Sequence, residues 1–158
     1  MVGGVLLVLV AVSAGGCTPH PPAPSMSLAE SRERMLALVD VTAATLGDRE
    51  WAEASGANLQ ACSLNGQEGH NLTYVRVGRA SSDPERDAAI VREFWESEGY
   101  ETRVGQFSNS RHTSLEIHVE NEDVRFVRYT VSDAFSGFTA ESVCLPGTSS
   151  EVIQRGEY

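Results

Sequence analysis

The polar side of one predicted strand carries the residues whose types and spacing come nearest to a metal-binding pattern. Between Thr113 and Glu120, an alternation of period two places Glu116 and His118 on one side with Glu120, and His112 shares their parity. Imidazole nitrogens and carboxylate oxygens are zinc ligands, and three or four of them must converge at about 2 Å from the ion. A metal-assisted enzyme that uses His112, Glu116 and His118 is therefore the alternative functional hypothesis.

Strand geometry argues against a metal at these residues. Alternate side chains of a strand project in parallel about 7 Å apart, so convergence on one ion needs ligands from neighbouring strands. A tight turn after Glu120 predicts three opposed pairs on the next strand: Val119 with Val124, His118 with Arg125, and Ile117 with Phe126. We therefore expect a solvated face on which Arg125 pairs with His118 or Glu116, and no metal or other cofactor.

The chain lacks the sequence motifs of common hydrolases and nucleotide-binding proteins. It contains no G-x-S-x-G and no G-x-G-x-x-G, and the absence of lysine excludes a P-loop. All 12 basic residues are arginine, and the 22 acidic residues give a net charge of −10. Such a domain repels polyphosphates over roughly a Debye length, about 8 Å at physiological salt, so no nucleic-acid partner is expected.

The N-terminal segment has the pattern of a secretory leader. Residues 5–12 (VLLVLVAV) form an apolar run too short to span a bilayer, and small residues lead from it to Cys17. This arrangement resembles the lipobox of bacterial lipoproteins, although Ala14 stands where leucine is commonest and no basic residue precedes the apolar run. The resemblance implies cleavage before Cys17 and a diacylglyceryl group on its sulfur. An uncleaved N-terminal anchor is the alternative.

The leader and the composition that follows predict how the chain is divided. We expect a signal peptide over 1–16, a lipidated Cys17 with a proline-rich linker over 17–26, an α+β domain over 27–147 and a polar, loose tail over 148–158. A diacylglyceryl group supplies two acyl chains, which make a durable membrane anchor. The expected location is therefore the extracytoplasmic face of the cell membrane, with the membrane as a partner through the lipid.

Two cysteines remain inside the domain if Cys17 carries lipid. Cys62 and Cys144 are an even pair in a chain expected to be exported, and exported chains fold in an oxidising compartment. They also lack the close spacing that metal-binding and redox-active cysteines normally have. The pair predicts a disulfide that ties an early strand of the domain to its end.

Hydrophobic periodicity predicts two helices and a mainly antiparallel sheet. One helix begins at the capping box of Ser27 and Glu30 and ends at Gly47, and a second runs from Pro84 to about Glu98. Between them we expect a loop or short helix over 48–58, strands over 59–64 and 72–77, and a turn over 65–71. Further strands are expected near 100–107, 113–120, 123–131 and 138–144. The predicted fold class is α+β, with both helices packed on one face of the sheet.

This layout resembles small exported lipoproteins of high-GC Gram-positive bacteria, many of which have no assigned activity. The resemblance rests on the leader, on the helix around Phe94 and Trp95 that ends at Gly99, and on Cys144 followed closely by Pro146 and Gly147. It implies a place in the cell envelope and carries over no catalytic residue.

The leading functional hypothesis is a lipid-anchored, non-catalytic domain of the cell envelope. Such a domain would bind an envelope protein or a small ligand, or stabilise an envelope assembly. A groove between the helices and the sheet, lined by Trp51, Trp95 and Tyr100, would favour ligand binding over a purely structural role. The metal-assisted enzyme remains the alternative, and it too would act outside the cytoplasm.

Overall fold

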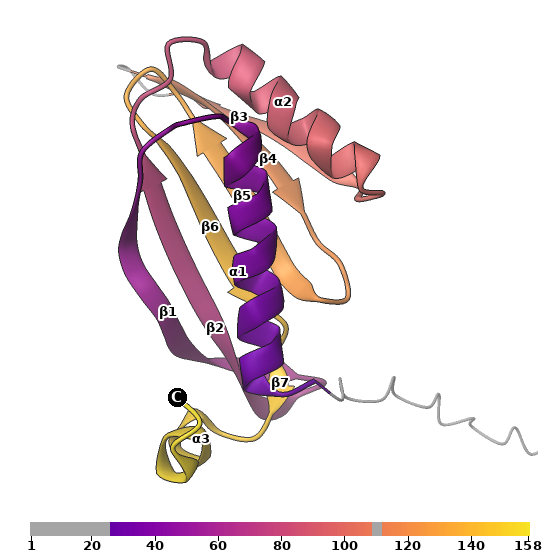
Figure 1. Cartoon of the computed structure of the whole chain (residues 1–158). Helices are drawn as coiled ribbons and strands as arrows, with labels where there is room; N and C mark the ends of the chain where they lie inside the picture. Colours follow the sequence, from indigo (N-terminus) through magenta and orange to yellow (C-terminus); the bar gives the residue numbers. More distant parts are fainter. Residues whose placement is uncertain (1–25, 109–111) are drawn as a thin grey trace, which may run out of the picture.

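A computed structural model describes residues 26–108 and 112–158, so Cys17 and the leader lie outside the described residues. The helices are α1 (Leu28–Thr45), α2 (Pro84–Ser97) and α3 (Ser149–Arg155). The strands are β1 (Trp51–Leu64), β2 (Gln67–Gly78), β3 (Thr102–Ser108), β4 (Thr113–Val119), β5 (Val124–Val131), β6 (Ser136–Ser142) and β7 (Leu145–Pro146). Figure 1 shows α1 and α2 on the same face of the sheet, which confirms the predicted α+β class.

The sheet has seven strands in the order β1-β2-β6-β5-β4-β3, and β7 pairs with β2 beside β6. All of its pairings are antiparallel, and β3 to β6 form the meander expected from the short connections. No helix in the described part of the chain is long and apolar enough to cross a membrane.

Both long helices begin at the predicted caps. The Ser27 hydroxyl accepts a hydrogen bond from the Glu30 amide at 3.2 Å, and the Glu30 carboxylate accepts one from the Ser27 amide at 2.8 Å. The Asp83 carboxylate caps α2 by accepting a hydrogen bond from the Arg86 amide at 3.1 Å, with Pro84 in the first turn. These caps satisfy amides that have no partner within the helix, which is why the helix starts could be read from the sequence.

The core lies between the two long helices and the sheet. Its largest fully buried side chains are Trp95, Tyr74, Tyr129, Phe138, Met35 and Leu72. Trp95, which is 0% exposed, donates its indole N–H to the Thr42 hydroxyl at 2.8 Å. This hydrogen bond joins α2 to α1 inside the apolar core and satisfies the one polar atom of the indole.

The first hairpin is longer than predicted. β1 begins at Trp51, so most of the segment expected to be a loop or short helix is a strand, and the turn spans only Asn65 and Gly66. Both turn residues have positive φ, 55° and 81°, as the Asn-Gly pair of a tight hairpin requires. The strand was missed because its pairing register shifts twice between Glu53 and Asn58, and these irregularities break the alternation of period two.

The predicted register between β4 and β5 is wrong. Val119 pairs with Val127 rather than Val124, and His118 pairs with Arg128 rather than Arg125. The turn is wider because the Asn121 side chain accepts hydrogen bonds from the amides of residues 123 and 124, at 2.9 and 2.8 Å.

A second irregularity follows at the start of β5. The pairing of β5 with β6 shifts between Val124 and Phe126. In the observed register of β4 and β5, Ile117 pairs with Tyr129. Phe126 lies on the opposite face of the sheet, where its ring centroid is 5.5 Å from that of His118.

The segment after Gly147 is ordered rather than loose. Thr148 and Glu151 form a capping box with hydrogen bonds of 3.2 and 2.8 Å, and α3 follows it. Val152 of this helix is 0% exposed. The tail was expected to be loose because it is polar, but one buried valine and a capped first turn are enough to fix a short helix on the domain.

Candidate functional site

The residues proposed as metal ligands lie on the uncovered face of the sheet and turn to separate partners. His112 lies 3.0 Å from the Asp133 carboxylate through Nδ1, just after the β5 strand. Glu116 on β4 accepts a hydrogen bond from the Thr130 hydroxyl at 3.3 Å and lies 3.8 Å from the Arg128 guanidinium. His112 and Glu116 therefore face different partners and do not point toward one common position.

His118, the third candidate, lies farther along the same strand. Its Nε2 is 3.2 Å from a carboxylate oxygen of Glu120, without hydrogen-bond geometry, and its ring packs on Phe126. Arg125, which was expected to face His118, instead binds Glu141 at 2.6 Å. Within residues 26–108 and 112–158, no three His, Cys, Asp or Glu side chains are grouped closely enough to hold a metal ion.

Trp51, Trp95 and Tyr100 do not line a common groove. Trp51 packs on Phe138 with a centroid distance of 5.1 Å, below the Arg49 guanidinium. Trp95 is enclosed in the core between the helices and the sheet. Tyr100 follows α2 and lines a different, shallow groove. The prediction that these three aromatic residues line one groove is therefore wrong.

The shallow groove lies between α1 and the turn from β4 to β5 and has a volume of about 260 Å³. Leu38 and Val124 form its apolar base, and Tyr100 stands at one side. Burial raises the pKa of the Tyr100 phenol, and nearby carboxylates add to the effect. An ion pair between Arg34 and Asp123 crosses the groove, so its charged groups already satisfy each other.

A larger cavity of about 450 Å³ lies at the start of α1. Its walls are the apolar side chains of Leu28 and Ala29 on α1, Ala57 on β1 and Leu72 on β2. Leu28 and Leu72 are 7% and 1% exposed, so they belong to the core as well as to the cavity. The two alanines are small, and Ala57 lies within the irregular segment of β1 between Ser55 and Asn58. These features leave a space that larger side chains would fill.

The mouth of this cavity is polar. It is formed by Arg32 from the first turns of α1 and by Glu157 and Tyr158, which follow α3. The Tyr158 hydroxyl donates a hydrogen bond to the Ala57 carbonyl at 3.1 Å, which holds the residues after α3 against β1. Two hydrogen bonds from Arg155, at 2.6 and 3.0 Å, hold the Glu157 carboxylate and lower its pKa.

No sequence pattern indicates this cavity directly, because its lining residues come from four separated segments. Part of its mouth belongs to the tail that was expected to be loose. The pattern Thr148-x-x-Glu151 has the same capping-box form as Ser27-x-x-Glu30, and it is the signal that would have predicted α3.

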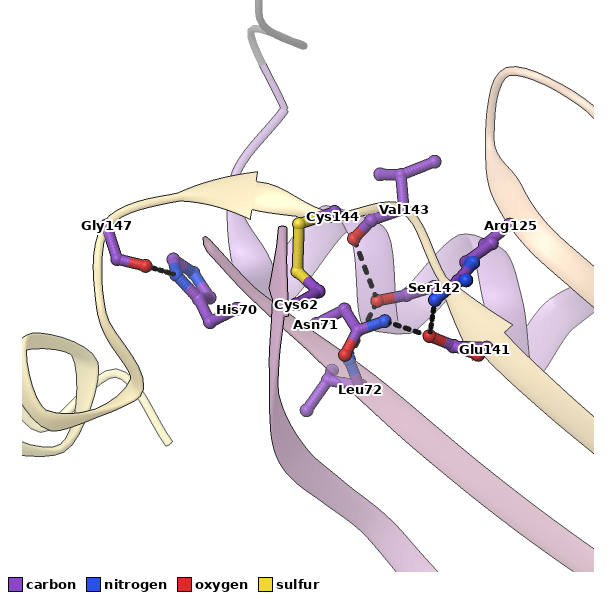
Figure 2. Close-up of a disulfide and its surroundings, with 10 residues drawn as sticks. All are labelled: Cys62, His70, Asn71, Leu72, Arg125, Glu141, Ser142, Val143, Cys144 and Gly147. Atoms are coloured by element: carbon purple, nitrogen blue, oxygen red, sulfur yellow. Dashed lines mark hydrogen bonds and ion pairs between the residues drawn. A yellow bond between two sulfur atoms is a disulfide. The ribbon is translucent and has the colours of Figure 1, made fainter. Parts of the chain in front are cut away.

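The end of the sheet nearest to α3 is closed by the disulfide between Cys62 and Cys144 (Figure 2). The pairing predicted from the two cysteines is thus confirmed, and it joins β1 to the residue before β7. At this point the partner of β2 changes from β6 to β7, with a shift of register. Where the partner changes, the Leu72 amide donates its hydrogen bond to the Ser142 hydroxyl at 2.9 Å.

Polar side chains surround the disulfide at the point where β2 changes its partner from β6 to β7. Asn71 is 0% exposed and donates its amide N–H to Glu141, which also binds Arg125 (Figure 2). His70, 3% exposed, lies 3.0 Å from the Gly147 carbonyl through Nδ1. These contacts are structural in character, because His70 turns toward the backbone and Asn71 turns its amide N–H toward another side chain of the same chain.

Comparison with known proteins shows a related fold. No family model matches the sequence, and no curated protein matches it. A crystal structure of a DUF4853 family protein from Actinomyces odontolyticus is similar, with a TM-score of 0.57 and 21% sequence identity. The match covers 80% of this chain and 73% of the other. Actinomyces is a high-GC Gram-positive genus, the group to which the sequence resemblance pointed, and at this identity the likeness concerns the fold alone.

Proposed function

We propose that this chain is an exported lipoprotein whose domain is held at the extracytoplasmic face of the membrane and binds a ligand without catalysis. The Cys62–Cys144 disulfide is the observation that carries the proposal. Disulfides form and persist in oxidising compartments and are rare in the cytoplasm. A domain stabilised in this way fits a chain whose leader resembles that of bacterial lipoproteins.

The position of α1 defines which end of the domain the lipid would hold. α1 begins beside β7 and α3, at the end of the molecule that also carries the disulfide (Figure 1). Residues 18–25 include four prolines. Because eight residues span at most about 29 Å even when fully extended, they would keep that end within about 29 Å of the lipid. The cavity at the start of α1 would therefore face the membrane side.

The cavity supports binding rather than catalysis. Its walls are apolar, and its mouth holds one arginine, one paired carboxylate and one phenol. Ligand sites commonly combine an apolar interior with a few polar groups that orient the ligand. The residues of the alternative enzyme hypothesis, His112, Glu116 and His118, turn to separate partners, so no observation favours that alternative.

Incorporation of labelled palmitate in a bacterial host tests the anchor. The unaltered chain should carry the label, and Cys17→Ser should carry none, because the thioether has no sulfur on which to form. Thr18→Ser is the matched control and should retain the label. Equal labelling of the unaltered chain and Cys17→Ser, or no label on either, would contradict the proposal.

A further inference from the structure

We propose that the cavity at the start of α1 binds a free, single-chain amphiphile whose anionic head group is a carboxylate. This inference rests on the proposed function, since it names the ligand class of the binding domain. Two independent features of the cavity carry it: an apolar interior and one unpaired cation at the mouth.

The interior suits a hydrocarbon chain. Leu28, Ala29, Ala57 and Leu72 present only apolar atoms from their side chains, and the volume of about 450 Å³ lies in the lower part of the range for small-molecule sites. These four side chains offer a polar ligand no hydrogen-bond partner to replace its hydration. An alkyl chain has no hydrogen bonds to water that it would lose, and each methylene that enters should strengthen binding about fourfold.

The charges at the mouth select an anion. Within the described ranges, Arg32 and Arg86 are the arginines that have no carboxylate within ion-pair distance, and Arg32 lies at the mouth of this cavity. Glu157, the acidic group at the mouth, is already bound by Arg155 through two hydrogen bonds. Arg32 therefore offers an unpaired guanidinium beside an apolar space, and a planar carboxylate matches its fork of N–H donors.

Isothermal titration calorimetry with decanoate tests the inference on the full-length chain carrying Cys17→Ser, which lacks the lipid and is purified without detergent. One decanoate should bind per chain, and octanoate, shorter by two methylenes, should bind more weakly by roughly tenfold or more. Decyltrimethylammonium, with the same chain and a positive head, should not bind. Because this chain has no lipid, the result is independent of the palmitate labelling that tests the anchor.

Two variants locate the binding. Arg32→Gln should weaken decanoate binding roughly ten- to hundredfold, the loss expected for a charge-assisted hydrogen bond. Arg86→Gln removes the same charge from the start of α2 and is the matched control, so its affinity should be unchanged. Ala29→Phe fills the cavity from the exposed side of α1 and should abolish binding while thermal unfolding shows that the domain remains folded.

Three results would overturn the inference. The first is no heat of binding with decanoate. The second is decanoate affinity that is unchanged in both Arg32→Gln and Ala29→Phe. The third is a chain that binds phosphatidylglycerol vesicles through Arg32 but does not bind decanoate. This result would assign the anionic head group to a membrane lipid.

Discussion

Gly69 occupies the most crowded backbone position next to the disulfide. A methyl group added there would lie 2.5 Å from the Cys144 sulfur and 2.8 Å from the Leu145 carbonyl oxygen. Neither neighbour is the flexible end of a long side chain, because the sulfur is fixed by its bond to Cys62. The requirement for glycine therefore comes from close approach of the chain and not from its φ angle.

Gly69→Ala should lower the free energy of unfolding by about 1–3 kcal/mol, the usual cost of overpacking. Gly56→Ala is the matched control on β1, the other strand of this hairpin, because a methyl group there would meet nothing within 4 Å. Urea unfolding of both variants checks the prediction. Equal stability of the two variants would contradict the assignment of Gly69 as a packing glycine.

The buried phenol of Tyr129 makes the stability of the fold depend on pH. Its ring is 0% exposed, and its hydroxyl accepts a hydrogen bond from Arg49 at 3.1 Å. Burial raises the pKa of the Tyr129 phenol, and the positive charge of Arg49 opposes this only in part. A pKa that is higher in the folded chain than in the unfolded chain means that the protonated phenol stabilises the fold.

The contribution of Tyr129 to stability should be complete below about pH 10 and should be lost as the pH rises above that value. Tyr129→Phe should therefore lose less stability between roughly pH 9 and pH 12 than the unaltered chain does. Tyr158→Phe, at a residue that is 60% exposed, is the control. Urea unfolding at a series of pH values measures the slopes, and identical slopes for the unaltered chain and Tyr129→Phe would refute the prediction.

Among the elements, the disulfide ties the edge strand β1 to the segment between β6 and β7. Cys62 lies on β1, an edge strand, and Cys144 precedes β7, with 82 residues of separation. Closing a loop of this length in the unfolded chain is worth about 4 kcal/mol in the chain-entropy treatment. The double variant Cys62→Ser with Cys144→Ser should lose about that much stability.

Thermal unfolding with and without a reductant checks this prediction. Reduction should lower the melting temperature of the unaltered chain, whereas the double variant should melt at one temperature under both conditions. An unaltered chain that melts at the same temperature with and without reductant would show that the bond contributes nothing to stability.

The elements with local signals were predictable. The capping box at Ser27 and the Asp83-Pro84 pair mark helix starts that depend on neighbouring residues only, and both were located correctly. The partner of Cys62 could also be predicted, because one other cysteine remains in the domain. Each of these features needs no knowledge of how distant segments pack.

The registers and the candidate site were not predictable by the same reasoning. The pairing of β4 with β5 depends on hydrogen bonds that the Asn121 side chain accepts from two backbone amides, and these bonds widen a turn that the sequence pattern treats as tight. The cavity depends on four segments that meet only after folding. Its single signal was the capping box at Thr148, which orders α3 and the residues that follow it.

In the molecule as a whole, the features on which the proposed function rests gather at one end. The start of α1, the disulfide, β7 and α3 lie together there (Figures 1 and 2). The cavity lies at this end too, since Leu28 begins α1 and lines its wall. A tether that enters α1 would hold this end toward the membrane and leave the opposite end toward the exterior.

The proposed membrane anchor requires that Cys17 carries a lipid and is the first residue of the mature chain. The most direct test is the intact mass of the protein extracted from the membrane of a bacterial host. We predict a mass equal to residues 17–158 plus a diacylglyceryl group on the N-terminal cysteine. A mass equal to the chain from Met1 with an unmodified Cys17 would contradict the account.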